Sequence, residues 1–220
     1  MTEFNTDLAR YNMIEQQIRP WDVLDPRVLE VIATTPRERF VPKEYLNLAF
    51  SDTEIPLAHG QCMLEPKLEG RILQSLQIKP DDRILEIGTG NGYLTACLAK
   101  LGKQVVSVDI YPDFSQHAQQ QIAGLGLDNV QFEVGDAAHG WKQDGDFDVI
   151  VISASLPMPQ PSFQESLTIG GRMFVVIGNE LLMEAQLIRR VSADDWSTES
   201  LFETHLPALL HAQKPQAFVF

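Results

Sequence analysis

The sequence predicts a doubly wound α/β fold with a mostly parallel sheet and an N-terminal helical extension. Short β-rich runs alternate with helical patterns between residues 83 and 177, as expected for βαβ units. The run from Val149 to Ile152 is apolar at every position, which is typical of a central strand that is buried on both faces. The first fifty residues, in contrast, carry helical patterns without a strand signal.

The N-terminal region predicts short helices. Apolar residues recur at helical spacing from Leu8 to Ile18, and Pro20-Trp21-Asp22 ends that pattern. Asp25-Pro26 combines an N-cap with a proline at the first helical position, which predicts a helix that stops before Pro36. Phe40-Val41-Pro42 and the aromatic-rich stretch from Tyr45 to Phe50 predict a further short element.

The rest of the chain supplies the alternating elements, and we expect one domain. Residues 1–65 would form the helical extension and a loop, 66–180 the ligand-binding core, and 181–220 the strands at the sheet edge. A polar turn at 192–195 separates the last two expected strands. Helices are expected at 66–76, 92–101, 113–123 and 161–168, and strands at 83–87, 104–108, 130–134, 148–153, 172–177, 185–191 and 200–206.

The composition is that of an ordinary globular protein, with 220 residues, 44% apolar and 21% charged. We expect a cytoplasmic protein without a membrane partner, because no stretch approaches the roughly 18 apolar residues of a membrane span and the N-terminus lacks a signal-peptide pattern. The net charge of −13 disfavours nucleic acid as a partner. Cys62 and Cys97 lack metal-ligand spacing, so no metal site is expected. The oligomeric state stays open.

A glycine-rich run from Glu86 to Gly92 lies where a predicted strand turns into a helix. Glycines allow tight or positive-φ turns and close approach of a ligand, and the helix N-terminus offers free N–H groups. Asp109 follows Gly88 by 21 residues and ends the next strand, where a carboxylate can accept both ribose hydroxyls. Together these features predict a nucleotide-type binding site.

The details of this run favour S-adenosylmethionine over a dinucleotide. The glycine spacing is G-x-G-x-G, whereas dinucleotide sites use G-x-G-x-x-G. Glu86 is poorly suited to a pyrophosphate but is compatible with a cationic ligand. S-adenosylmethionine carries a sulfonium and an ammonium and no phosphate.

The run Glu86-Ile87-Gly88-Thr89-Gly90-Asn91-Gly92-Tyr93 resembles the cofactor motif of class I S-adenosylmethionine-dependent methyltransferases, and more specifically that of protein-L-isoaspartate O-methyltransferases. Further blocks resemble the same family in order, including Phe40-Val41-Pro42, His59-Gly60-Gln61 and Gly135-Asp136, over roughly residues 10 to 180. The resemblance implies that Asp109 holds the ribose and Asp136 the adenine amine. The implied cofactor site is Glu86, Ile87, Gly88, Thr89, Gly90, Asn91, Gly92, Asp109, Ile110, Gly135, Asp136 and Ala137.

The substrate loop differs from the family pattern. Where the family has Thr-Ile-Ser after Gly-Gln, this chain has Cys62-Met63-Leu64, so Leu64 stands at the position of the family's active-site serine. His59 is a second candidate for a catalytic role, as a donor or base, although a local hydrogen-bonding role is the more common one for a histidine in a loop. The implied substrate contacts are Gly60, Gln61, Cys62, Met63 and Ser153.

The resemblance implies an O-methyltransferase that methylates the carboxylate of altered aspartyl residues in proteins or peptides for repair. Such a nucleophile is already ionised at neutral pH, so positioning and electrostatics carry the rate. Because Leu64 lacks a hydroxyl, two alternatives stay open. One is a methyltransferase of the same fold with a different acceptor, and the other is a cofactor-binding module with little isoaspartyl activity.

Overall fold

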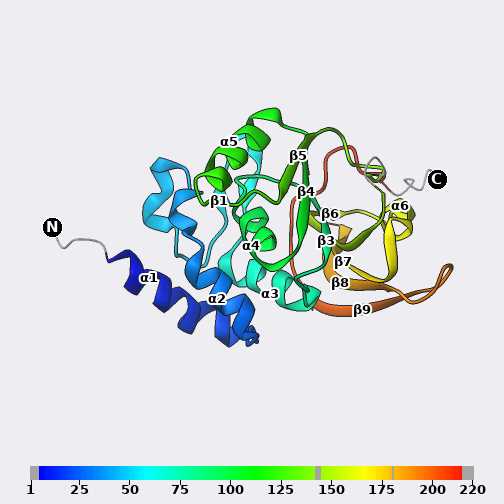
Figure 1. Cartoon of the computed structure of the whole chain (residues 1–220), viewed down its shortest axis with the longest axis horizontal. Helices are drawn as coiled ribbons and strands as arrows, with labels where there is room; N and C mark the ends of the chain where they lie inside the picture. Colours follow the sequence, from blue (N-terminus) through cyan, green and yellow to red (C-terminus); the bar gives the residue numbers. More distant parts are fainter. Residues whose placement is uncertain (1–4, 142–144, 180, 215–220) are drawn as a thin grey trace.

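A seven-stranded sheet forms the centre of the molecule (Figure 1). The computed structural model describes residues 5–141, 145–179 and 181–214. The first five strands across the sheet are parallel to one another, and each of the last two is antiparallel to the strand before it. The prediction of a doubly wound, mostly parallel sheet is confirmed. The strand order is β5 (Val130–Val134), β4 (Gln104–Asp109), β3 (Arg83–Ile87), β6 (Phe147–Leu156), β7 (Leu167–Asn179), β8 (Leu182–Arg190) and β9 (Trp196–Glu203).

The strand order reverses between β3 and β6, and this reversal positions the site. The chain runs from β3 outward to β4 and β5, then returns to β6 on the other side of β3. Connections on the two sides of such a point lead away from each other, so a crevice opens at the carboxyl ends of the strands.

Helices cover both faces of the sheet (Figure 1). The N-terminal helices, α3 (Pro66–Leu76), α4 (Tyr93–Leu101) and α5 (Pro112–Ala123) cover one face, and α6 (Pro161–Glu165) covers the other. The predicted N-cap Asp25 precedes α2 (Pro26–Thr34), which begins at Pro26 as predicted, and Asp25 Oδ1 accepts from the Arg27 N–H at 2.8 Å. The N-terminal extension comprises α1 (Thr6–Met13), η1 (Ile14–Ile18), η2 (Arg19–Trp21), α2 (Pro26–Thr34), η3 (Arg37–Arg39) and η4 (Lys43–Leu48).

The run from Val149 to Ile152 in β6 is apolar at every position because both faces of this strand are covered. Val149 and Val151 belong to the cluster under the N-terminal helices, α3 and α4. Ile150 and Ile152 belong to the cluster on the opposite face, which includes Phe163 of α6. This alternation confirms the interpretation of the apolar run as a doubly buried strand.

Several predicted boundaries are wrong. The loop before α3 contains a hairpin of β1 (Ile55–Pro56) and β2 (Cys62–Met63), joined through η5 (Ala58–Gly60), which was not expected. The last helix stops at Glu165 because Leu167 already pairs with Phe147 in the sheet. The final strand spans Trp196–Glu203, whereas 200–206 was expected. Residues 197–200 are polar and exposed, so the sequence gives no apolar signal for this part of the strand.

The segment after β9 returns to the carboxyl end of β6. The N–H of Ser155 donates to the Pro207 carbonyl at 2.9 Å, and the Leu209 N–H donates to the Ser155 carbonyl at 2.8 Å. Residues 207–212 therefore lie beside the crevice. Within the described ranges, no helix has the length and apolar character needed to cross a membrane.

Candidate active site

The loop between β3 and α4 forms the first wall of the site. Gly88, Gly90 and Gly92 have φ values of 96°, 53° and 88°, in the region that favours glycine. A Cβ on Gly88 would lie 2.3 Å from the Ser153 hydroxyl oxygen, and one on Gly92 would lie 2.6 Å from the Cβ of Ala118. The missing side chains therefore let β6 and α5 close against the loop.

Asp109 ends β4 and binds the same loop. Its Oδ2 accepts from the Gly90 N–H and its Oδ1 accepts from the Tyr111 N–H, both at 2.9 Å. Burial raises the pKa of Asp109, and these backbone donors oppose the shift. The carboxylate is thus held in place before any ligand arrives, with lone pairs left to accept ribose hydroxyls.

Glu86 lies beneath the loop and does not line the cavity described below, which corrects the expectation that it meets a cationic ligand. It is fully buried, and its Oε2 accepts from the hydroxyls of Thr95 and Ser107, both at 2.6 Å. Its Oε1 has no hydrogen-bond partner among the described residues. Burial raises the pKa of Glu86 to about 8, so the group is largely protonated at neutral pH. It links β3, β4 and α4 from within.

One cavity lies at the carboxyl ends of β3, β4 and β6, and it encloses about 850 Å³ when its open mouth is included. This size lies in the range of small-molecule sites. Glu86, Gly92, His59 and Gly60 do not line it. The predicted site residues that do are Gln61, Cys62, Met63, Leu64, Ile87, Gly88, Thr89, Gly90, Asn91, Asp109, Ile110, Gly135, Asp136, Ala137 and Ser153.

Nine further lining residues were missed by sequence reasoning. Most lie in segments with no motif of their own, and three come from the C-terminal segment that crosses β6. Among the described residues that line the cavity, the charged ones are carboxylates and none is Lys or Arg. The missed residues are Glu69, Leu94, Val108, Tyr111, Phe114, Ala154, Ala208, Leu209 and Leu210.

Asp136 lies where the C-terminal segment meets the loop after β5. Its Oδ1 accepts from the Ala138 N–H at 2.9 Å, and its Oδ2 lies 2.7 Å from Nδ1 of His211. The Ala138 N–H, followed by His211, lowers the pKa of Asp136. The segment bearing Leu209 and Leu210 is thereby tied to the side of the cavity predicted to hold adenine.

The substrate loop forms the opposite wall. Leu64 is only 7% exposed, and its carbonyl accepts from Nη2 of the buried Arg37 at 2.6 Å. Cys62 also lines the cavity, and burial raises the pKa of its thiol to about 12. Cys62 therefore remains a thiol at neutral pH, in agreement with its interpretation as a contact residue and not a nucleophile.

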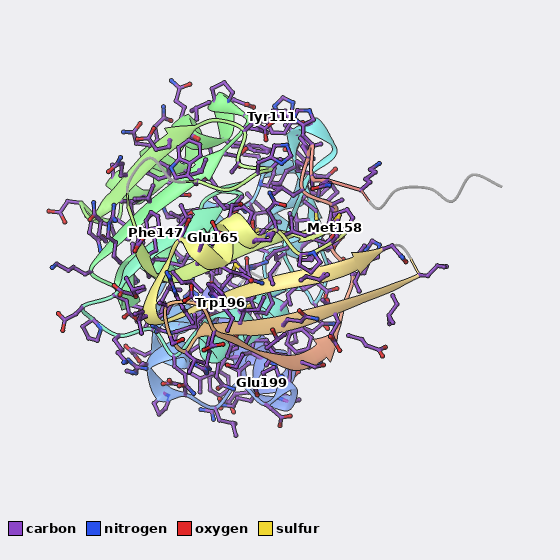
Figure 2. The ribbon with its side chains drawn as sticks, turned by 90° about the vertical axis from the view of Figure 1, so that its right-hand side faces the viewer. Tyr111, Phe147, Met158, Glu165, Trp196 and Glu199 are labelled. Carbon is purple, nitrogen blue, oxygen red and sulfur yellow. The ribbon has the colours of Figure 1, made fainter. Side chains whose placement is uncertain are left out.

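His59 is turned toward α5. Its φ is 57°, its ring stacks on that of Tyr111 with centroids 3.9 Å apart, and its Nε2 lies 2.9 Å from Asp113 Oδ2. Figure 2 shows Tyr111 at the edge of the molecule beside the ribbon of the N-terminal region. His59 thus joins the substrate loop to α5 at the rim, which fits local hydrogen bonding and not a catalytic base.

Ser153 faces the loop more than the cavity. Its hydroxyl lies 3.0 Å from the Ile87 carbonyl and 2.8 Å from the Gly88 carbonyl, so its single proton is used on the cofactor loop. Ser153 lines the cavity, as expected of a substrate contact, while its hydroxyl holds the glycine loop.

A model of the family Protein-L-isoaspartate(D-aspartate) O-methyltransferase matches residues 9–207 of this chain. The chain belongs to this family. A protein-L-isoaspartate O-methyltransferase of Protochlamydia amoebophila is 37% identical over 83% of this chain and 86% of the relative. One from Brucella anthropi is 32% identical over 90% of this chain and 91% of the relative.

A solved structure from Plasmodium falciparum, described as a protein-L-isoaspartate O-methyltransferase in complex with S-adenosyl-L-homocysteine, shares the fold. It has a TM-score of 0.80 and 19% identity, and covers 94% of this chain and 99% of its own. The predicted O-methyltransferase family is confirmed by the family model and the relatives, and the solved structure agrees with the predicted fold.

Proposed function

We propose that this chain transfers a methyl group from S-adenosylmethionine to the carboxylate of altered aspartyl residues in proteins and peptides. The observation that carries this proposal is a single cavity that joins the glycine loop and Asp109 to the substrate loop at 61–64. The proposal includes a single domain, in which 66–180 binds the cofactor and 1–65 supplies the acceptor side, and a cytoplasmic location.

The residues present fit this cofactor. Asp109 is already oriented by two backbone N–H groups and can accept from the ribose hydroxyls. Asp136 and the apolar Ala137 and Leu209 would contact the adenine. A cavity lined by carboxylates and by no described Lys or Arg suits a ligand with a sulfonium and an ammonium. When bound, S-adenosylmethionine supplies an electrophilic methyl group.

The chain's own contribution is to position the acceptor and exclude competing groups. A carboxylate acceptor is ionised at neutral pH and needs no general base. Cys62 is the only thiol lining the described cavity, and its raised pKa keeps it protonated and weakly nucleophilic. The substrate loop is fixed by Arg37, which binds the Leu64 carbonyl.

Leu64 favours a second candidate, a methyltransferase with a different acceptor. A buried branched alkyl side chain lines the cavity where the family serine would offer a hydroxyl. Loss of a donor of this kind costs on the order of 3 kcal/mol in the barrier in other enzymes. An acceptor without a carboxylate would not need this donor.

The deciding experiment incubates the full chain with methyl-labelled S-adenosylmethionine and an isoaspartyl peptide, with the matching aspartyl peptide as control. We expect a base-labile methyl ester on the isoaspartyl peptide alone. Cofactor binding with no label on either peptide would reject this acceptor and leave a different acceptor or a cofactor-binding module. Absence of cofactor binding would reject both.

A further inference from the structure

Glu69 is a buried carboxylate in the wall of the cavity that the function described above leaves without a role. It lies in the first turn of α3, is 2% exposed, and lines the cavity together with Leu64, Asn91 and Leu94. Arg37 joins Glu69 to the Leu64 carbonyl of the substrate loop. In addition to burial, the charge of Glu69 raises the pKa of Glu86 and of Tyr93, the residues on either side of 87–92, which places Glu69 close to the glycine loop as well. Asp109 and Asp136 lie on the ribose and adenine sides.

Arg37 engages only one oxygen of this carboxylate. Nη1 of Arg37 donates to Oε2 of Glu69, while its Nη2 donates to the Leu64 carbonyl and its Nε to the Ala49 carbonyl. Among the described residues no other donor reaches Glu69, so Oε1 is available on the cavity side. Because Arg37 holds the carboxylate through Oε2, Oε1 is well placed to accept a hydrogen bond from a charged donor on a ligand.

The charges around Glu69 favour a cation. No described Lys or Arg lines the cavity, and Arg37 is directed at protein oxygens. A substrate carboxylate would be repelled by a second carboxylate in this position. The ligand donor that fits is an ammonium group close to the glycine loop.

We propose that Oε1 of Glu69 accepts a hydrogen bond from the α-ammonium group of the amino-acid part of S-adenosylmethionine. This inference rests on the proposed function, because it requires that cofactor in the cavity. It makes Glu69 a binding residue for the amino-acid part, beside the Asp109 site for the ribose. It also joins cofactor binding to the substrate loop, because Arg37 contacts both Glu69 and Leu64.

The test compares two ligands by calorimetry on the full chain. S-adenosylhomocysteine contains the α-ammonium, and 5′-methylthioadenosine has the same nucleoside without the amino-acid part. Glu69→Gln should weaken S-adenosylhomocysteine about tenfold or more and change 5′-methylthioadenosine less than twofold. Glu86→Gln is the matched control, because Glu86 is also a buried carboxylate beside the loop but does not line the cavity, and it should not discriminate between the ligands.

A measurement on the unmodified protein covers the case in which Glu69→Gln does not fold. Burial raises the pKa of Glu69 to about 7, so an ammonium that favours the ionised form should release up to about half a proton at pH 7. The other titratable groups near Glu69 are Arg37, Tyr93, Cys97 and Glu86. None of these four residues lines the cavity, so the difference in proton release between the two ligands is attributed to Glu69.

The outcomes separate this inference from the proposed function. The role of Glu69 would be overturned if Glu69→Gln lowered the affinity for both ligands equally or for neither. Equal proton release with both ligands would overturn it as well. Each of these results would leave the proposed function intact. If the unmodified protein binds neither ligand, the proposed function fails, and the inference fails with it.

Discussion

Replacement of Asp109 by alanine tests the cofactor site most directly. The carboxylate is 8% exposed and accepts two backbone N–H groups at 2.9 Å. In the complex it would also accept the ribose hydroxyls in charge-assisted hydrogen bonds, which contribute roughly 1.5–3 kcal/mol each. Water replaces part of this hydrogen bonding in the variant. We therefore expect the binding free energy of the ligand to become less favourable by about 2–4 kcal/mol, which raises Kd about 30- to 800-fold.

Asp109→Asn is the matched comparison. An amide of the same shape keeps one oxygen acceptor but loses the charge, so its Kd should lie between those of the natural protein and Asp109→Ala. The N–H groups of Gly90 and Tyr111 lose an acceptor in the alanine variant, and some loosening of the loop is part of the predicted effect.

The assay is isothermal titration of S-adenosylhomocysteine into each protein, with a thermal melt of the ligand-free chain to show that the fold is retained. Asp113→Ala provides a control, since Asp113 is an exposed carboxylate near the same edge that pairs with His59 at the rim. An Asp109→Ala protein that melts normally and binds with unchanged affinity would show that the ribose is held elsewhere.

Three further results are expected. Leu64→Ser should raise the rate on isoaspartyl peptide by roughly tenfold or more, measured as kcat/KM, and an unchanged rate would show that a hydroxyl at this position is not needed. Because the pKa of Glu86 is raised to about 8 from 4.5, its contribution to stability is complete below about pH 4.5 and is lost as pH rises to about 8, at about 1.4 kcal/mol per unit. In denaturant titrations, Glu86→Gln should therefore reduce the fall in the free energy of unfolding between about pH 4.5 and 8 and leave the part of the fall that is due to Glu69. An unchanged dependence on pH would contradict the raised pKa of Glu86. Asp82→Ala should destabilise the fold by about 3–5 kcal/mol, because it leaves Arg172 buried without its 2.6 Å carboxylate partner, and a loss under 1 kcal/mol would show that water replaces the partner.

The strands and the glycine loop were predictable because their signals are local. A strand covered on both faces favours apolar residues at successive positions, and the run at 149–152 follows this pattern with residues adjacent in the sequence. Asp109 was predictable for a related reason, since parallel strands end at one edge and the acid that ends the next strand must lie beside the loop. The boundaries at the exposed edge strand were wrong, because polar residues there carry no burial signal.

The orientation of the site residues depended on contacts between distant parts of the chain. Glu86 is part of the glycine motif, yet the hydroxyls of Thr95 and Ser107 hold it under the loop, where it does not line the cavity. Glu69 has no motif, and it lines the cavity because Arg37, 32 residues earlier, is buried against it. The sequence by itself determined the family, the sheet and the glycine loop, since these depend on local pattern and spacing. Only the tertiary structure decided which carboxylates line the cavity, because the direction of a side chain is set by the donors that long-range packing brings to it.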